Sequence, residues 1–445
     1  MKYITHIIIA VCCASIFFSC ETTTTTEKQT SNIAQLTAFS FAHNDSMPGL
    51  SKALFTIEER LDTGLVWNKD SMLYGTRLDS VVPRFVFAAT PGISYLTLPD
   101  TTCSLTGYDT LNFSKGPIYL TILSSDESTT KVYEIKPTVH QVDPDLYQWS
   151  SLTHSIYPAD DSEQKVVELG SSFVMISNNG FQLHAYTSQD GALWQSEGQI
   201  AGLPASANIR QIVSDGTTLY YGEGNQLYTS TNATQWSAQT VTYPIHTLLL
   251  YWNEVVWALV ENDGYELATY DGSIHLSGLR PSSDFPVSDF ASVCFHSASQ
   301  RERAMIIGGF AQSGKALNTR WNLEYTPYAS QNKGYRMEEF SIDRPSFTSL
   351  TGISVIWYNN QLMMFGGVDA NRNYFGRHIL ISNDEGLNWI PADSTKNQLP
   401  TEYGERQKQN AIVRDNNIYL FGGQDKNTTF SDVYRGRLNS IDWNK

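Results

Sequence analysis

Polar and aromatic side chains gather in three stretches of the C-terminal half, each of which follows a pair of glycines. The stretches cover residues 309–320, 367–377 and 423–431. Amides, carboxylates and aromatic rings are groups that can bind a sugar or a peptide at a protein surface. The same residue types are also common in loops for purely structural reasons, and both interpretations stay open. The candidate ligand-binding residues are Phe310, Asp369, Asn371, Arg372, Tyr374, Gln424, Asp425 and Asn427.

Catalytic and metal-binding residues are harder to find in this sequence. None of the nine histidines shows the spacing of metal ligands, so we predict neither a metal site nor a cofactor. A nucleophilic cysteine needs a histidine partner and an electropositive surrounding, and nothing local to Cys103 or Cys294 marks either one. We therefore expect these two cysteines to be free, mostly buried thiols.

Hydrophobic strands precede the glycine pairs and predict the elements that position the candidate loops. The three copies are Met305–Gly309, Met363–Gly367 and Tyr419–Gly423, and their glycine pairs lie 58 and 56 residues apart. Repeats of this length with glycine and aromatic markers are typical of a β-propeller. Glycine suits the end of such a strand because it tolerates positive φ and the close approach of a neighbouring backbone.

A second repeated signal is a turn that contains serine and closes on tryptophan, clearest in Ser382–Trp389. In such a turn an Asp or Asn side chain caps the turn, and the tryptophan packs across the sheet. Together the two signals predict six blades between residue 145 and the C-terminus. Outer strands are expected to begin at Trp194, Trp236, Trp389 and Trp443. Inner strands are expected at residues 209–213, 255–260, 353–357 and 411–414.

The two ends of the predicted propeller complement each other. The chain stops shortly after Trp443, so the last blade has too few residues for most of its outer strand. Residues Tyr147–Thr153 resemble an outer strand but have no blade of their own. Pairing this segment with the last blade would close the ring and remove its exposed edges.

Residues 33–140 contain short alternating strands separated by polar turns, which predicts a β-sandwich of immunoglobulin-like (Ig-like) size. The segment from Leu111 to Ile135 resembles the closing hairpin of Ig-like modules in Bacteroidetes surface lipoproteins, which usually act as spacers. Residues Gln141–Asp145 form the expected linker. The expected strands of the sandwich are 36–41, 53–57, 84–88, 118–123 and 131–135.

The N-terminus has the features of a targeting segment and is excluded from the fold. Lys2 precedes an apolar stretch, Ile7–Phe18, that is too short to span a bilayer as a helix. Ser19 and Cys20 follow, and the segment 1–19 resembles a bacterial lipoprotein signal, which implies cleavage before Cys20 and lipidation of its thiol. The alternative is an ordinary secretory signal that is cut slightly later. Residues 20–32 would then form a flexible tether.

The composition is acidic and rich in aromatic residues. The formal net charge is −15, and it becomes −16 when Lys2 leaves with the signal. No run of lysine or arginine offsets this charge, so nucleic acid is a disfavoured partner. Aromatic residues make up 12% of the chain, and no long segment shows helical periodicity, which together favour an all-β protein.

Each repeated signal resembles a known structural motif. The strand with its double glycine resembles the Kelch repeat, and Ser382–Trp389 resembles the Asp-box of sialidase-like propellers. A sialidase-like enzyme would need three arginines around a substrate carboxylate, a tyrosine nucleophile with a glutamate partner, and an acidic proton donor. The characteristic Arg-Ile-Pro start is absent here. The arginines that could face the channel are Arg210, Arg344, Arg406 and Arg414.

The signal, the Ig-like domain and the Kelch-like propeller together resemble a family of Bacteroidetes lipoproteins. The resemblance covers nearly the whole chain and implies a monomer that is anchored to a membrane of the cell envelope by its N-terminal lipid. We expect a non-catalytic binding module whose partner is a glycan or a protein. The alternative is a divergent, sialidase-like enzyme that processes glycosides.

Overall fold

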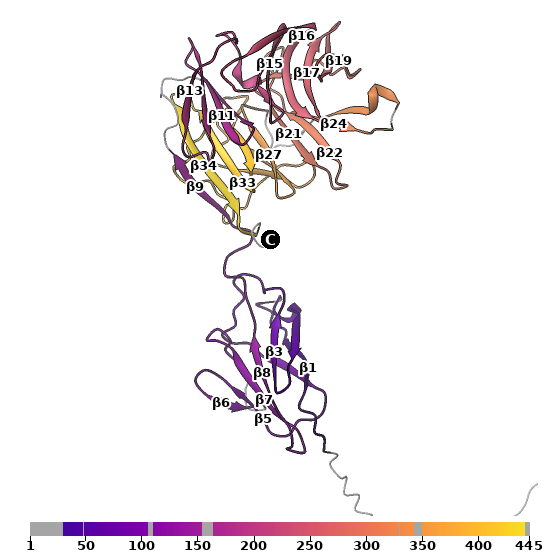
Figure 1. Ribbon diagram of the computed structural model, residues 1–445, viewed down its shortest axis with the longest axis vertical. Coiled ribbons are helices and arrows are strands. Elements are labelled where there is room, and N and C mark those ends of the chain that lie inside the picture. The colour runs from indigo at the N-terminus through magenta and orange to yellow at the C-terminus, as the bar shows by residue number, and fades with distance from the viewer. Residues whose placement is uncertain are drawn as a thin grey trace, which may run out of the picture. The chain divides into compact units, whose positions relative to one another are not determined.

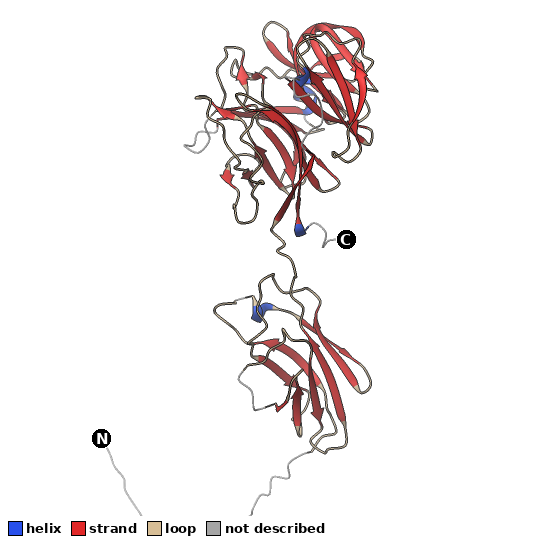
Figure 2. Ribbon diagram, turned by 90° about the vertical axis from the view of Figure 1, so that its left-hand side faces the viewer, coloured by secondary structure: helices blue, strands red, loops and turns tan. Residues whose placement is uncertain are grey.

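The computed structural model describes residues 30–47, 49–105, 110–153, 163–328, 330–341 and 349–440 of the protein. The chain forms two compact units that divide between Gln141 and Val142. Strands dominate both units, and the helices within the described ranges are three short 3-10 turns (Figure 2). The prediction of an all-β protein is therefore confirmed. The predicted signal peptide, Cys20 and Trp443 lie outside the described ranges.

The N-terminal unit contains one six-stranded and one two-stranded sheet. The larger sheet has the order β2-β3-β8-β7-β5-β6, in which β3 and β8 run parallel and all other neighbours are antiparallel. The smaller sheet pairs β1 with β4. The strands are β1 (Leu36–Phe41), β2 (Phe55–Glu59), β3 (Thr63–Asn68), β4 (Pro83–Phe87), β5 (Ser94–Thr97), β6 (Thr102–Ser104), β7 (Ile118–Leu123) and β8 (Thr130–Lys136).

Side chains from both sheets of this unit share one core. Phe39 and Phe41 of β1 belong to the same buried cluster as Ile118 and Leu120 of β7. The predicted strands match β1, β4, β7 and β8, and the segment 53–57 is displaced by two residues from β2. Strands β3, β5 and β6 were missed because they are short or contain glycine and serine, which weaken the strand signal.

In the described ranges the C-terminal unit contains four four-stranded sheets, one six-stranded sheet and two two-stranded sheets, with antiparallel neighbours throughout. The first sheet is β10 (Glu163–Leu169), β11 (Ser172–Asn178), β12 (Leu183–Ser188) and β13 (Gln195–Gln199). The six-stranded sheet is β14 (Val213–Ser214), β15 (Leu219–Ser230), β16 (Ser237–Trp252), β17 (Val255–Glu261), β18 (Tyr265–Tyr270) and β19 (Ile274–Leu276).

The remaining large sheets of this unit each have four strands. The third is β21 (Ala291–His296), β22 (Glu302–Ile307), β24 (Thr319–Tyr325) and β25 (Tyr335–Ser341). The fourth is β27 (Ser354–Tyr358), β28 (Gln361–Phe365), β30 (Leu380–Ser382) and β31 (Ile390–Pro391). The fifth is β32 (Asn410–Arg414), β33 (Asn417–Gln424), β34 (Thr429–Leu438) and β9 (Tyr147–Thr153).

Strand β16 belongs to two halves of the six-stranded sheet. Its first half pairs with β15, through Ser237↔Thr229, and its second half pairs with β17, through Trp252↔Val255. The second half of β16 is therefore the innermost strand of its half-sheet. The segment 255–260, expected as an inner strand, is the second strand. The sequence prediction was wrong here because both strands are long and apolar, so hydrophobicity alone does not rank them.

Strand β9 joins the last sheet although it lies almost 300 positions earlier in the chain than β34 (Figure 1). The pairing runs antiparallel from Tyr147↔Leu438 to Thr153↔Val433. A Cβ atom on Gly436 would lie 2.5 Å from the Trp149 ring, so glycine makes room for the indole. The Trp149 Nε1–H donates a hydrogen bond of 3.0 Å to Asn397 Oδ1, which fixes β9 against the neighbouring sheet.

The serine–tryptophan turns have one recurring geometry. In Ser382–Trp389, Ser382 Oγ donates to Asp384 Oδ1 at 2.8 Å, and Asp384 Oδ1 accepts from Asn388 N at 2.8 Å. The Trp389 indole then donates to Gly386 O at 3.1 Å. The corresponding indole bonds of Trp194 and Trp236 measure 2.9 and 2.8 Å. These tryptophans stand just before β13, β16 and β31, so the predicted structural role of the turns is confirmed.

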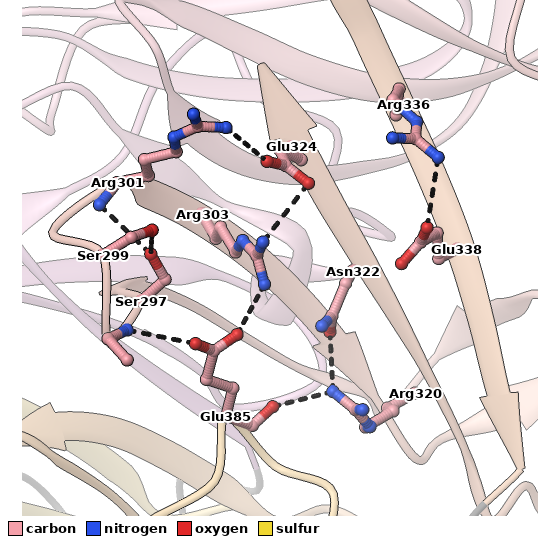
Figure 3. A network of polar contacts seen from close by, with 11 residues as sticks. Ser297, Ser299, Arg301, Arg303, Arg320, Asn322, Glu324, Arg336, Glu338 and Glu385 are labelled. Atoms are coloured by element: carbon pink, nitrogen blue, oxygen red, sulfur yellow. Dashed lines mark hydrogen bonds and ion pairs between the residues drawn. The ribbon is translucent and has the colours of Figure 1, made fainter. Parts of the chain in front are cut away.

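One of these turns also ties two sheets together (Figure 3). Arg303 of β22 forms ion pairs with Glu385, at 2.5 Å, and with Glu324 of β24, at 3.3 Å. Arg320 Nη1 donates to the Glu385 carbonyl at 2.7 Å. The turn of the fourth sheet is thereby held on the third sheet, and these arginines serve packing between sheets.

Candidate functional site

One hollow of the C-terminal unit, lined by all five of its larger sheets, is a cavity of about 350 Å³, which we call the central cavity. Every large sheet contributes wall residues, taken from its innermost strand or the segment just before it. This volume lies within the range of small-molecule sites. The wall segments are 165–168, 208–216, 248–250, 288–292, 353–355 and 409–412.

The glycine pairs press against the segments that lead into the inner strands. All six glycines have positive φ, from 48° to 100°. A Cβ atom on Gly308 would lie 2.4 Å from Leu350 O, and one on Gly423 would lie 2.8 Å from Gln407 O. Both predicted reasons for glycine, positive φ and close backbone approach, are therefore confirmed.

The loop that follows each glycine pair is hydrogen-bonded to the leading segment of its own sheet. Strand β20 (Pro286–Ser288) pairs with β23 (Phe310–Ala311), and β26 (Leu350–Thr351) pairs with β29 (Val368–Asp369). In the last sheet, Gln407 and Gln424 exchange two backbone hydrogen bonds of 2.9 Å. We call the three loops, residues 309–320, 367–377 and 423–431, the rim loops. Phe310 and Gln424 directly follow their glycine pairs, and Asp369 and Asp425 each stand one residue further along their loops.

The carboxylates of the rim loops are engaged by their own turns. Asp369 Oδ1 accepts hydrogen bonds of 2.8 Å from the backbone N–H groups of Asn371 and Asn373, and the Asn373 bonds hold the pKa of Asp369 below its usual value. Asp425 Oδ1 accepts from the N–H groups of Asn427 and Thr428 at 2.7 and 2.6 Å. Both carboxylates therefore have a structural role, whatever else they bind.

The remaining candidates differ in exposure and in proximity. Asn371, Arg372 and Asn427 are exposed, whereas Phe310, Tyr374 and Gln424 are half-buried. Burial, with the charge of Asp425, raises the pKa of Tyr374. Phe310 instead bridges to Ala316 within the first rim loop. The assignment of all eight residues to ligand binding stays a prediction.

A cluster of charges lies at the end of the central cavity that Asp289 and Arg210 line. Asn208 caps a 3-10 turn, Ile209–Gln211, and accepts a hydrogen bond from Arg210 N at 3.2 Å. The Arg210 side chain donates to Lys408 O at 2.8 Å, and its Nε lies 3.6 Å from Asp289 Oδ1. Lys408 Nζ lies 3.8 Å from the same oxygen. Two cations thus share one carboxylate.

Lys165 of β10 also lines the central cavity, and sequence reasoning did not select it. It makes no hydrogen bond or ion pair to any residue in the described part of the chain. Burial, with the Arg210 charge, lowers the pKa of Lys165 to about 7. The signal that could have found it is a lysine between Gln164 and Val166 in an otherwise inward-packed strand.

The four arginines proposed for a sialidase-like site do not meet in the described structure. Arg210 lines the cavity, but Arg406 is buried behind the rim, where it pairs with Asp432 at 2.5 Å and lies over the Phe430 ring. Arg414 lies over the Phe173 ring, 3.9 Å from Glu168 Oε1. The expectation that Arg406 and Arg414 face the channel is wrong, because aromatic rings and carboxylates hold them between strands. Arg344 lies outside the described residues.

Three other features bear on chemistry. Cys103 and Cys294 are free and half-buried, and burial raises the pKa of Cys294 to about 12, so its thiol stays protonated near neutral pH. Across the described ranges, no group of three or more His, Cys, Asp or Glu side chains could hold a metal ion. In the same ranges, no helix has the length and apolar character needed to cross a membrane.

Comparisons with known proteins identify the two parts of the chain. Residues 143–445 match the DUF6242 beta propeller domain, and residues 18–136 match the DUF6242 N-terminal domain. No curated protein matches the sequence. A solved structure described as "Structure of YjhT" is 12% identical, and the match covers 63% of this chain and 95% of that chain with a TM-score of 0.47. The chain belongs to the DUF6242 family, and its C-terminal part is a β-propeller domain.

Proposed function

We propose that the protein is a monomeric, non-catalytic binding module of the cell envelope, which contacts a glycan or a protein through its rim loops. The observation that carries this proposal is the repetition of one arrangement in three successive sheets. In each, a glycine pair turns the chain into a polar loop that is bonded to the leading segment of the same sheet. Repeated loops around one opening form a contact surface that can vary while the scaffold stays rigid.

The propeller has six blades in this proposal. The four-stranded sheets supply four, and the six-stranded sheet supplies two because β16 serves both of its halves. The pairing of β9 with β34 supports closure of the ring by an N-terminal strand. Closure pairs the outer edge of β34 with β9, and this would reduce edge-to-edge association of an extracytoplasmic protein. The double glycines are Kelch-like and the serine–tryptophan turns Asp-box-like.

The N-terminal unit serves as an Ig-like spacer, and lipid on Cys20 serves as the anchor. Replacing Cys20 by serine is expected to move the protein from the membrane fraction of cells to the soluble fraction. Cys103→Ser is the matched control and should leave the distribution unchanged. Membrane retention of the Cys20→Ser variant would contradict the anchor.

Binding is favoured over the sialidase-like alternative by the placement of the charged groups. Among the described residues, Arg210 is the only one of the four proposed arginines that lines the cavity. Burial, with the charge of Asp425, raises the pKa of the rim residue Tyr374, which suits a neutral phenol more than a nucleophile. The carboxylates at the rim cap turns, and this leaves them poorly placed as proton donors.

A glycan array with the purified protein tests the proposal. Binding to one glycan class is expected, with a loss of about tenfold or more in affinity for Tyr374→Ala, because half-buried aromatic residues dominate contact surfaces. Tyr328→Ala, at an exposed tyrosine outside the rim loops, is the matched control. Silence on every glycan would direct the search to a protein partner, which affinity capture with wild-type and Tyr374→Ala baits would identify by difference. Equal binding by both baits would refute the role of the rim loops.

A further inference from the structure

The central cavity contains a cation without a partner. Lys165 lines the wall from β10, and nothing within the described ranges accepts a hydrogen bond from its ammonium group. Asn410 lines the same wall, is 7% exposed, and its Nδ2 has no acceptor. Arg210 Nε is likewise buried without an acceptor. Two buried donors without a hydrogen-bond acceptor in the described structure thus lie at the same cavity as the half-buried Lys165, which is unusual because buried polar groups are normally hydrogen-bonded.

The neighbouring charges do not neutralise Lys165. Asp289 is already shared by Arg210 and Lys408, at 3.6 and 3.8 Å. Glu168, three residues along β10, lies 3.9 Å from Arg414 Nε. Glu163, at the other end of β10, lines a small hollow with Arg210 and Lys408, and its charge acts on Arg210. Each of these three carboxylates therefore has another cation beside it. No carboxylate in the described part of the chain forms an ion pair with Lys165.

We propose that the central cavity binds a small organic anion, whose carboxylate or phosphate group is held by Lys165 and Arg210. Asn410 supplies a further donor. The cavity, at about 350 Å³, is larger than an inorganic ion needs and suits a compact organic molecule. Among the described residues that line the central cavity, none belongs to the rim loops, and the site does not depend on the proposed function of those loops.

Binding of an anion is coupled to a proton. The empty cavity disfavours the charged amine, since burial and Arg210 lower the pKa of Lys165 to about 7. A bound anion favours the charged amine and raises this pKa again. Above pH 7 the site must take up one proton to bind, so the affinity should fall about tenfold for each pH unit.

Competitive acetylation of the purified protein, read at each lysine by mass spectrometry, tests the site. The probes are phosphate and glucuronate at about 50 mM, with chloride at equal ionic strength and glucose as controls. A Kd of about 1 mM would slow acetylation of Lys165 about 50-fold. We expect this protection from at least one of the two anions, and from neither control. The exposed Lys315 should be acetylated at the same rate throughout.

The pattern of protection distinguishes the ligand classes. Protection by phosphate alone identifies a phosphorylated ligand, and protection by glucuronate identifies a carboxylate. If neither anion slows the acetylation of Lys165, or if both slow Lys315 equally, the proposal is wrong. This result comes from the wild-type protein and does not depend on any variant folding.

Titration calorimetry with the protecting anion supplies the second test. Lys165→Met should abolish the binding heat, whereas Lys315→Met and the rim variant Tyr374→Ala should bind as the wild type does. The affinity of the wild type should weaken about fivefold from pH 7 to pH 8, because about half of the Lys165 amines are already neutral at pH 7. Binding that survives in Lys165→Met, or that is unchanged between the two pH values, would overturn the assignment of Lys165.

Discussion

The rim loops and the wall of the central cavity both carry charged side chains, but these side chains are satisfied to different degrees. On the rim, Asp369 and Asp425 are hydrogen-bonded to the backbone of their own loops. On the wall, Lys165 has no partner in the described structure, and Asn410 Nδ2 is buried without an acceptor. A polar loop residue can thus be fully explained by its turn, whereas an unpaired buried donor requires a further explanation.

The contrast between rim and wall would fail if the stability of the rim also depended on a buried charge. Arg406 pairs with Asp432 behind the third rim loop and donates to Gly422 O at 3.0 Å. Arg406→Ala should lower the free energy of unfolding by about 3–5 kcal/mol, because it leaves a buried carboxylate without its cation. Chemical unfolding monitored by tryptophan fluorescence measures the change. Arg372→Ala, at an exposed rim arginine, is the control and should change stability by less than about 0.5 kcal/mol.

The contrast between rim and wall becomes clearer if the charge of Lys165 in the wall destabilises the folded protein. The folded-state pKa of Lys165, about 7, lies below the ordinary value of a lysine. The lysine therefore opposes folding fully below pH 7, and this penalty fades as the pH rises toward the unfolded pKa of about 10.4. Lys165→Met should raise the free energy of unfolding by about 2 kcal/mol at pH 6.5, allowing for cavity water, and by less at pH 9.5. Equal effects at both pH values would contradict the buried charge.

The smallest expected change in stability distinguishes a rim residue that caps its turn, Asp425, from a rim residue proposed only as a ligand contact, Asn427. Asp425→Ala removes two hydrogen bonds to backbone N–H groups and should cost about 1 kcal/mol of stability. Asn427→Ala keeps the backbone donor and should cost almost nothing. Thermal unfolding of both variants checks this pair. A loss of stability in Asn427→Ala equal to that in Asp425→Ala would show that the loop depends on more than its cap.

The repeats made the architecture predictable, because glycine pairs and tryptophan turns have direct backbone causes. Gly308 and Gly422 have the positive φ that their position in the repeat implied, and Trp389 has its expected hydrogen bond. The order of the strands within a sheet, counted outward from the innermost strand, was less predictable. Residues 255–260 are as apolar as an inner strand, and their second place follows from the pairing of β16 alone.

The charged groups of the cavity wall could not be located from sequence. Lys165 and Arg210 are 45 positions apart, and Asp289 and Lys408 are farther still, so only the packing of the sheets in the C-terminal unit brings them together. The arginines show the same limit. Arg406 and Arg414 resembled channel residues in composition, but contacts with Asp432 and Phe173 hold them elsewhere.

The most direct test of the contrast between rim and wall is the titration of Lys165 itself. Competitive acetylation of the anion-free protein across the pH range gives the pKa of each lysine. The account predicts a pKa of about 7 for Lys165. A pKa of Lys165 near the ordinary lysine value of about 10.4 would mean that the wall holds no uncompensated cation, and it would contradict the account.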